Sequence, residues 1–545
     1  MLDREYGAIY LGFMLLLGPS DRRFAAGMVA DDAEALIEEA RRRARRRWWR
    51  RGVAFAGLVV AAAAVVAYGV SGGGAGVVAQ TAARPFANLS AFAGRGELAF
   101  VSRGGLWVLD GQRGSLRRLT VPRGWTPSSP EFSRDGRWLA YLTAASTTGF
   151  PTKVELWLAR GDGSGARVVR NLDINQPVGW SPNSDMLAVI GGSTGSTLEV
   201  IQPAGRSTVL VALSGDAARY GSLESAAWSP DGREIAVSTV DFRGPTHGTT
   251  IRAYPVAGGA PTTWFRIRND QPFPAHICSR CGHGTETIAD VIGWWPRWGI
   301  AFWVYCCGAV HDNDGSQVAI LSRPGGRPRF LARTLSSRAT DAITAGGGGS
   351  LALVADALND GGREIGSGKT VETCNSTSYL CTPLPGARTW VGTDHQRCAV
   401  PTQTAKQCLG SAVPPAGRPG SGVSLDPSWS PSGDRLAYIR APVALTGGWP
   451  DSAWYAAHGL YVWNARTGAT RRISAVDGAS VPTWSADGHE LLYVHDDGLW
   501  LAPIDRGTPI EIAFPLFHPS GLYTSFTHDY YGQIPWNAQF SWARP

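Results

Sequence analysis

The sequence is poor in charged residues and in several residue types that carry chemistry. Only 17% of its 545 residues are Asp, Glu, Lys or Arg, and the chain holds just three Lys, four Met and ten His. Low charge combined with 44% hydrophobic residues excludes an intrinsically disordered chain. Residues 53–545 carry 40 basic and 36 acidic groups, so no strong field attracts a polyanion to this long region. We therefore expect no nucleic-acid partner.

Long hydrophobic runs are almost absent. The charge-free run VAFAGLVVAAAAVVAYGV at 53–70 would span about 27 Å as a helix, close to the bilayer core of about 30 Å. The preceding run RRRARRRWWRR at 41–51 should stay in the cytoplasm. We predict a cytoplasmic segment with an Arg-rich helix at 1–52, a transmembrane helix at 53–70, a Gly-rich tether at 71–84 and an extracytoplasmic domain at 85–545. A cleaved signal peptide ending at Ala79 is the alternative.

Complete catalytic motifs are missing as well. Residues 191–195 spell GxSxG, but a nucleophile elbow requires an α/β domain. GSGKT at 366–370 lacks the first Gly of a phosphate-binding loop, because Arg363 stands there. HDNDG at 311–315 lacks both the first ligand and the closing Glu of a calcium loop. We predict from these absences that the chain is not an enzyme and has no cofactor.

The chain is rich in Gly, Pro and Trp, and it is repetitive. One pattern combines an aromatic residue, a four-residue polar turn and an alternating apolar strand, as in WSPDGREIAVS at 228–238. The turn predicts a β-hairpin in which Gly takes positive φ and Ser and Asp bond the backbone. The aromatic ring should pack between adjacent sheets. Copies begin at Phe132, Trp180, Trp228, Trp429 and Trp484.

A second pattern joins a strand through a Gly-rich turn to another strand, as in LWVLDGQRG at 106. Two hairpins per repeat make a four-stranded sheet that must stack on its neighbours in a ring. We therefore predict an all-β propeller of seven to eight four-stranded blades, with eight favoured. The C-terminal QFSWARP should add a strand to the first blade and close the ring. Copies of the second pattern begin at 106, 156, 198, 251, 318, 379, 460 and 499.

The WSPDG-x-x-[IL]-A and LWV-x-D-x-x-G patterns resemble the TolB-type, WD-like propeller repeat over about residues 90–515. Propellers of that family usually have six blades, so a count of eight departs from its pattern. The resemblance implies protein–protein contacts in the bacterial envelope.

The repeat phase places all short turns on one face of the propeller. This short-turn face takes the turns between first and second strands and between third and fourth strands. The opposite, long-loop face takes the loop between second and third strands and the link to the next blade. The long insertions, such as 268–293 and 388–428, fall on the long-loop face. Because binding residues tend to lie on loops held by a rigid scaffold, we expect function there.

An even number of cysteines beyond a membrane anchor favours disulfides. We place all eight on or beside the long-loop face and expect Cys278 and Cys281 to pair with Cys306 and Cys307. Local bridges would join Cys374 to Cys381 and Cys398 to Cys408. The alternative is a metal site, with Cys278, Cys281 and His283 joined by Cys306, Cys307 and His311.

Aromatic residues outside the repeat are the candidate binding residues: Trp449, Trp454, Tyr455, Tyr530 and Tyr531. They either seal the ring against water or form a patch for a partner. We predict a membrane-tethered module that binds an envelope protein, peptide or glycan. The alternatives are a propeller lyase or hydrolase that uses loop carboxylates and His, and a transmembrane signalling sensor.

Overall fold

We describe the protein from a computed structural model. Residues 82–545 form one compact unit. The structure describes residues 84–146, 151–172, 177–192, 195–241, 248–268, 287–306, 316–336, 342–345, 348–355, 370–384, 422–442, 455–516 and 536–543. The predicted cytoplasmic segment, the membrane span at 53–70 and nearly all of the tether lie outside these ranges. Within them, no helix is long and apolar enough to cross a membrane.

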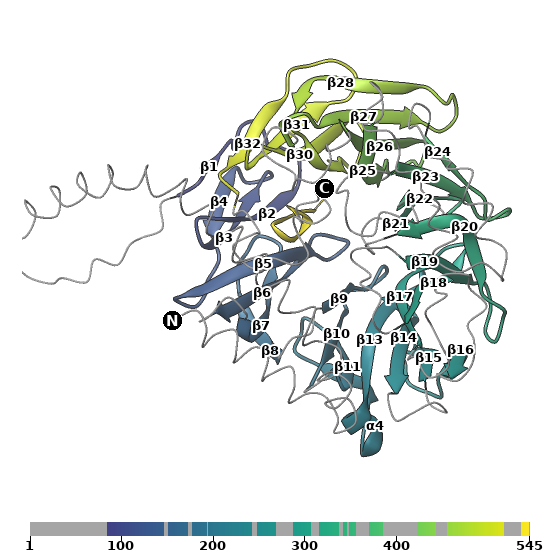
Figure 1. The fold of residues 1–545 in the computed structure, drawn as a ribbon. Coiled ribbons are helices and arrows are strands. Elements are labelled where there is room, and N and C mark those ends of the chain that lie inside the picture. Colours follow the sequence, from purple (N-terminus) through teal and green to yellow (C-terminus); the bar gives the residue numbers. More distant parts are fainter. Residues whose placement is uncertain are drawn as a thin grey trace, which may run out of the picture. The chain divides into compact units, whose positions relative to one another are not determined.

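Eight antiparallel sheets are arranged around a ring, with the first strand of each sheet toward the middle and the fourth outside (Figure 1). The all-β fold and the count of eight blades are therefore confirmed. Between neighbouring blades, first strands lie against each other and bury aliphatic and aromatic side chains. The core consists of these interblade layers, as expected for sheets that cannot bury both faces alone.

The strands of blades 1 to 4 are, in blade 1, β33 (Phe540–Ala543), β2 (Glu97–Ser102), β3 (Gly105–Asp110) and β4 (Ser115–Arg118); in blade 2, β5 (Trp125–Phe132), β6 (Trp138–Ser146), β7 (Pro151–Arg160) and β8 (Arg167–Leu172); in blade 3, β9 (Pro177–Trp180), β10 (Leu187–Gly191), β11 (Thr197–Ile201) and β12 (Ser207–Ala212); and in blade 4, β13 (Gly221–Trp228), β14 (Glu234–Asp241), β15 (Gly248–Pro255) and β16 (Thr262–Arg268). A short helix, α4 (Asp216–Tyr220), precedes β13.

The strands of blades 5 to 8 are, in blade 5, β17 (Thr287–Trp295), β18 (Gly299–Cys306), β19 (Ser316–Leu321) and β20 (Arg329–Ser336); in blade 6, β21 (Ala342–Thr344), β22 (Ser350–Ala355), β23 (Thr370–Asn375) and β24 (Cys381–Pro383); in blade 7, β25 (Gly422–Trp429), β26 (Arg435–Pro442), β27 (Gly459–Asn464) and β28 (Thr470–Asp477); and in blade 8, β29 (Ser480–Trp484), β30 (Glu490–His495), β31 (Gly498–Pro503) and β32 (Ile510–Phe514). The 3-10 helix η4 (Trp536–Ala538) precedes β33.

Blade 6 departs from the sequence prediction. The segment that begins at 379 was expected to hold the third strand, but it holds the fourth strand, β24. The third strand is β23, whose sequence TVETCN has few large apolar residues and no Gly-rich turn after it. Strand formation here follows from pairing with β22, from Ser350↔Asn375 to Ala355↔Thr370. Tertiary pairing thus overrides a weak local signal.

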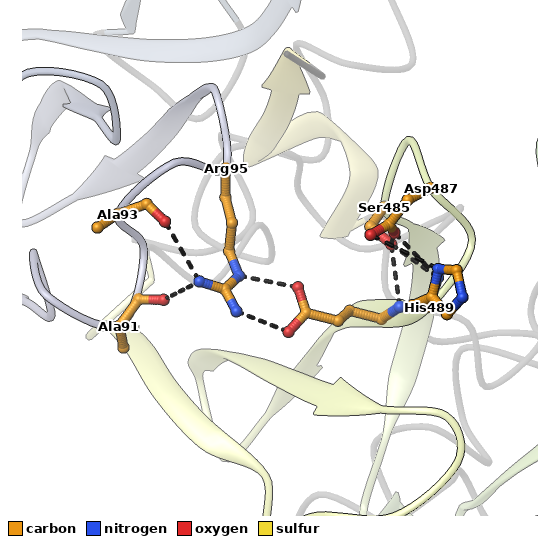
Figure 2. Close-up of polar contacts among 7 residues, drawn as sticks. Ala91, Ala93, Arg95, Ser485, Asp487 and His489 are labelled. Carbon is orange, nitrogen blue, oxygen red and sulfur yellow. Dashed lines mark hydrogen bonds and ion pairs between the residues drawn. The ribbon is translucent and has the colours of Figure 1, made fainter.

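The repeated polar turns on the short-turn face are closed by their own side chains. The hydroxyl of Ser485 donates to the Asp487 carboxylate at 2.6 Å and accepts the backbone N–H of Glu490 at 2.9 Å (Figure 2). Ser229 makes the same two bonds with Asp231 and Glu234. The bond from the hydroxyl lowers the pKa of Asp487. Because Ser and Asp side chains of the turns bond the backbone N–H groups of the same turns, these turns can stay short on this face.

The aromatic residue of each repeat links two blades. It lies buried at the end of an inner strand, and where it is Trp rather than Phe132 its indole N–H donates to a backbone carbonyl on the inner strand of the preceding blade. This arrangement confirms the predicted packing of the rings between sheets and satisfies the one polar atom of each ring. The pairs, at 2.8–3.2 Å, are Trp180–Glu131, Trp228–Gly179, Trp429–Ile343 and Trp484–Ser428.

Both described ends of the chain close the ring between blades 8 and 1. Strand β33 pairs with β2 as the inner strand of blade 1, with Phe100 opposite Phe540, as predicted for the C-terminal segment. Strand β1 (Phe86–Ala87) adds a fifth strand outside β32 of blade 8 (Figure 1). An ion pair between Arg95 and Glu490 spans the same seam (Figure 2).

Candidate functional site

The two faces of the propeller differ in the connections that they carry. Every described turn on the short-turn face has at most seven residues, the longest being 322–328. The strand ends joined by segments 269–286, 356–369, 384–421 and 443–458 all lie on the other face. The predicted division into a short-turn face and a long-loop face therefore holds for the described strand ends. The candidate site is built on the long-loop face, where connections can vary without disturbing the sheets.

His458 lies on the long-loop face of blade 7, directly before β27. It is 2% exposed, and its Nδ1 is 3.3 Å from the carbonyl oxygen of Ala479 at the start of blade 8. Its ring is 5.5 Å from the ring of Tyr455. Burial lowers the pKa of His458 to about 4, so the imidazole is neutral near pH 7. His458 is therefore a buried, uncharged side chain between two blades that contacts Tyr455.

His495 lies on the same face, at the end of β30, and approaches the segment Gly478–Ala479 that His458 also contacts. A Cβ added to Gly478, the neighbour of Ala479, would lie 3.0 Å from the Nδ1 of His495. The Nε2 of His495 is 3.3 Å from the carboxylate of Asp496, and its ring packs edge-on against Trp500. Nδ1 is buried, and none of the described residues supplies it with a hydrogen bond. His495 therefore combines a contact to an exposed carboxylate with a buried Nδ1 that has no hydrogen-bond partner among the described residues.

Three inner strands carry unusual backbone: those of blades 7 and 8, which hold this cluster, and that of blade 2. Ser129, Asp426 and Val481 have positive φ of about 50°, and each precedes a proline at a bulge. Positive φ is strained for a β-branched residue such as Val481. The Asp426 carboxylate accepts the Val481 N–H at 3.0 Å, so blade 7 holds the strained segment of blade 8. Strain of this kind is common at functional sites.

Glu131, on inner strand β5 of blade 2, is an acid in an unusual position. Its side chain occupies the space left by Gly179 of blade 3, since a Cβ there would lie 3.3 Å from the carboxylate. Neighbouring protein atoms raise the pKa of Glu131 by desolvation and a backbone N–H of Trp180 opposes the shift, although the side chain itself is exposed to solvent. None of the other inner strands has an acid at the position before the repeat's aromatic residue. The sequence alone gave no reason to single out Glu131.

Most of the predicted aromatic binding residues lie outside the described residues. These are Trp449, Trp454, Tyr530 and Tyr531. Tyr455 is described, and it is partly buried against the core of blades 7 and 8. Its contact with His458 places it at the candidate site, and its role in binding stays a prediction.

One of the predicted disulfides is present. Cys374 and Cys381 are bonded to each other and stand opposite in the register of β23 and β24. The turn between these strands belongs to the short-turn face, so the prediction that all cysteines lie by the long-loop face is wrong for this pair. Cys306 ends β18, and its side chain is not described. Cys278, Cys281, Cys307, Cys398 and Cys408 lie outside the described residues, so their pairing stays a prediction. In the described parts of the chain, no three His, Cys, Asp or Glu side chains could hold a metal ion.

Sequence reasoning did not find the pair His458 and His495. They are 37 positions apart in different blades, and neither stands in a motif. The available signal was topological. His458 ends a long insertion between the second and third strands of blade 7, and His495 ends the second strand of blade 8, so both belong to one face.

Comparisons with known proteins find similar structures but no similar sequence or family model. No protein-family model matches the chain, and no curated protein matches its sequence. The TolB-type resemblance is therefore not shown. Solved structures do match. An oligogalacturonate lyase in complex with manganese has 13% identity and a TM-score of 0.40, and the match covers 78% of this chain and 98% of that one.

Peptidases match over part of their length. For a structure from a study of two prolyl endopeptidases, identity is 13% and the TM-score 0.38, with 78% of this chain and 55% of that one covered. For dipeptidyl peptidase 4 of Porphyromonas gingivalis, identity is 9% and the TM-score 0.45, with 77% and 59% covered. At such identities the likeness concerns the fold alone. The matching structures are named as a lyase and peptidases, and our expectation from missing motifs that the chain is not an enzyme is corrected accordingly, without assigning an activity to the chain.

Proposed function

We propose that the protein binds a ligand on the long-loop face of its propeller, around Tyr455, His458 and His495. The observation that carries the proposal is the asymmetry of the two faces. One face consists of short turns closed by their own Ser and Asp side chains, and the other receives every long connection. The buried inner strands and interblade tryptophans supply the rigid scaffold that such loops need.

We also propose that the span at 53–70 anchors the propeller outside the cytoplasmic membrane. The Arg-rich run before the span supports this orientation. The disulfide between Cys374 and Cys381 agrees with it, because disulfides persist mainly in oxidising compartments. The partner would then be an envelope protein, peptide or glycan that meets the face carrying Tyr455.

A photo-crosslinking amino acid in the native host tests the binding face. We place it at Tyr455 on the long-loop face and, as a matched control, at the exposed Arg134 in the short turn of blade 2. One defined adduct from position 455, and none from position 134, is the expected result. Equal adducts from both positions would contradict the proposed binding face.

A second candidate function, a lyase or hydrolase, is favoured by the pairing of His495 with Asp496. A carboxylate that orients an imidazole is a common arrangement for general acid–base catalysis. The test panel includes oligogalacturonates and prolyl peptides, taken from the names of the matched enzymes. If His495 is the base, His495→Gln should lower turnover by about 100-fold or more.

His489 gives the matched control for this test. It lies 3.6 Å from Asp487, but on the short-turn face and exposed. His489→Gln should leave turnover unchanged. A similar loss in both variants, or no turnover by the unmodified protein on any member of the panel, would contradict the catalytic candidate and leave the binding proposal to its own test.

A further inference from the structure

The outer strand of blade 3 differs from most other outer strands in that it carries no charge. This strand is β12, with the sequence STVLVA. The outer strands of blades 1, 2, 4, 5 and 7 each carry two arginines, and β32 of blade 8 carries Glu511. The uncharged outer strand of blade 6, β24, has only three residues and ends in Pro383. Among the described strands, β12 is therefore the longest uncharged one at an outer edge.

Charge on an outer strand protects the edge of its sheet. Charged side chains and bulges keep other chains from pairing with the free backbone of an edge strand. A bulge interrupts the pairing of β12 with β11, but the pairing of β8, β16, β28 and β32 is irregular too. The bulge does not distinguish β12 from these strands, whereas the missing charge does. Strand β12 is thus the long outer strand with the least protection against pairing.

The backbone of β12 offers hydrogen-bonding groups at this edge. The N–H of Gln202 donates to the carbonyl of Arg206 at 2.8 Å, which sets the phase of the ladder between β11 and β12. Because bonded residues alternate along an antiparallel pair, Ser207 and Val209 direct their N–H and C=O groups away from β11. Both residues are exposed, Val209 to 52%. No described strand pairs with this edge, because β12 is the last strand of its sheet.

Blade 8 shows that an outer edge of this propeller accepts a further strand. There β1 pairs with the outer strand β32, with Phe86 opposite Phe514, and extends the sheet to five strands (Figure 1). Addition of a strand to an exposed edge is a general mode of recognition, in which backbone hydrogen bonds supply the affinity. Strand β12 offers the same kind of edge without a strand from its own described chain.

A second copy of β12 is the partner that fits this edge. Two copies paired antiparallel about a two-fold axis bring no like charges together, whereas two copies of an Arg-bearing outer strand would do so. The ends of the strand are complementary as well. Exposed Arg206 precedes β12 and exposed Asp216 follows it by four residues. Antiparallel pairing turns the Arg206 end of one copy toward the Asp216 end of the other.

We propose that β12 is a self-association edge, at which two copies of the chain pair antiparallel and join their two blade 3 sheets into one continuous sheet. The Thr and Val side chains of β12 are of the β-branched type that stabilises cross-strand pairs. The contact lies at the outer edge of blade 3, so it does not use the long-loop face. It is also independent of the proposed anchor at 53–70.

Sedimentation velocity of the full-length protein in detergent tests the edge. Val209 lies near the middle of β12, so any antiparallel overlap of most of the strand brings the two copies of this position close together. Val209→Lys would place like charges there. Val168→Lys is the matched control, because Val168 is 40% exposed on the outer strand of blade 2, beside Arg167. Unchanged thermal unfolding shows that each variant folds.

We expect the unmodified protein to form a dimer whose dissociation constant rises about fivefold or more in Val209→Lys and stays unchanged in Val168→Lys. A mixture of Val209→Lys with Val209→Glu should recover the dimer, because the charges are then opposite. Ala212→Lys serves in place of Val209→Lys if that variant does not fold. A monomer at every concentration reached, or an equal loss in Val168→Lys, would overturn the proposal.

Photo-crosslinking in the native host separates a second copy from a foreign partner. Benzoylphenylalanine is placed at the exposed Thr208 of β12 and, as the control, at Val168. An adduct of twice the mass of the chain from position 208, and none from position 168, is the expected result. An adduct from position 208 with a different protein only would refute self-association and assign the edge to a strand of that protein.

Discussion

Arg95 and Glu490 form a two-point ion pair across 395 residues of sequence. Nε and Nη2 of Arg95 each lie 2.8 Å from a carboxylate oxygen of Glu490, and Nη1 donates to the Ala91 carbonyl at 2.8 Å (Figure 2). Both side chains are mostly shielded from solvent. The pair joins the segment before β2 to the first residue of β30, so it fastens blade 1 to blade 8 where the ring closes. Its fork geometry is one that Lys cannot reproduce.

Replacing Arg95 should therefore weaken the contact between blades 1 and 8. We expect Arg95→Ala to lower the free energy of unfolding by about 2 kcal/mol, because it removes charge-assisted hydrogen bonds to a half-buried carboxylate. Arg95→Lys should recover less than half of that loss. Urea unfolding of the full-length protein measures both.

Arg471 provides the control for this prediction. It pairs with Asp505 across blades 7 and 8, but both side chains are at least half exposed. Arg471→Ala should cost less than about 0.5 kcal/mol. Equal losses from the two alanine variants would show that the ion pair at the ring closure stabilises the protein no more than an exposed ion pair does.

A second prediction concerns the interblade tryptophans. Trp484→Phe keeps the buried ring but leaves the carbonyl of Ser428 without its indole donor. We expect a loss of about 1–2 kcal/mol in the free energy of unfolding. Trp484→Ala should cost about 3–5 kcal/mol, because it also leaves a cavity. In Trp500→Phe, at a partly buried position, the loss should be below about 0.5 kcal/mol. If Trp484→Phe lowers the free energy of unfolding as little as Trp500→Phe does, the hydrogen bond to Ser428 does not stabilise the propeller.

The repeat made most of the fold predictable. An aromatic residue, a Ser-x-Asp-Gly turn and an alternating strand are local features, so about 50 consecutive residues are enough to predict a blade. The closing strand was predictable for the same reason, because Phe540, Ser541 and Trp542 resemble the start of a repeat. Blade 6 failed where the local features were weak. Its third strand, TVETCN, is defined by its pairing with β22 rather than by its own composition.

The candidate site could be placed only by face. The phase of the repeat indicated on which face the long loops lie, and it therefore placed Tyr455 on that face. The neighbourhood of His458 and His495 depends on how blades 7 and 8 stack, which is a long-range property. The same holds for Arg95 and Glu490, and for Glu131, which fills the space over a glycine of the next blade. No spacing in one sequence encodes such contacts.

A third prediction concerns the disulfide of blade 6. The double replacement Cys374→Ser with Cys381→Ser should lower the free energy of unfolding by about 2 kcal/mol, the value expected for a closed loop of about eight residues. Hydrogen exchange should rise mainly in β23 and β24. Mass mapping of a non-reduced digest should recover the linked pair before replacement. Its absence from protein taken from the native host would contradict both the bridge and the proposed oxidising compartment.

The last prediction is a pH dependence that arises from His458. Its pKa is lowered to about 4 in the folded protein, whereas an unfolded His has a pKa near 6.5. Between these values the unfolded chain binds the proton and the folded protein does not. Stability is therefore complete above about pH 6.5 and is lost as the pH falls toward 4. Between pH 7 and pH 5 the contribution of this one group amounts to about 2 kcal/mol.

His458→Gln removes the titrating group and isolates its effect. In this variant the fall in the free energy of unfolding between pH 7 and pH 5 should be about 2 kcal/mol smaller than in the unmodified protein. His489→Gln is the control, since His489 is exposed and its replacement should leave the slope unchanged. Carboxylates whose pKa is raised, such as Glu131, titrate alike in the unmodified protein and in the variant, so the difference between the two slopes reports His458 alone. Identical slopes in the unmodified protein and in His458→Gln would mean that His458 is hydrated, and its place as a neutral buried element between blades 7 and 8 would then be wrong.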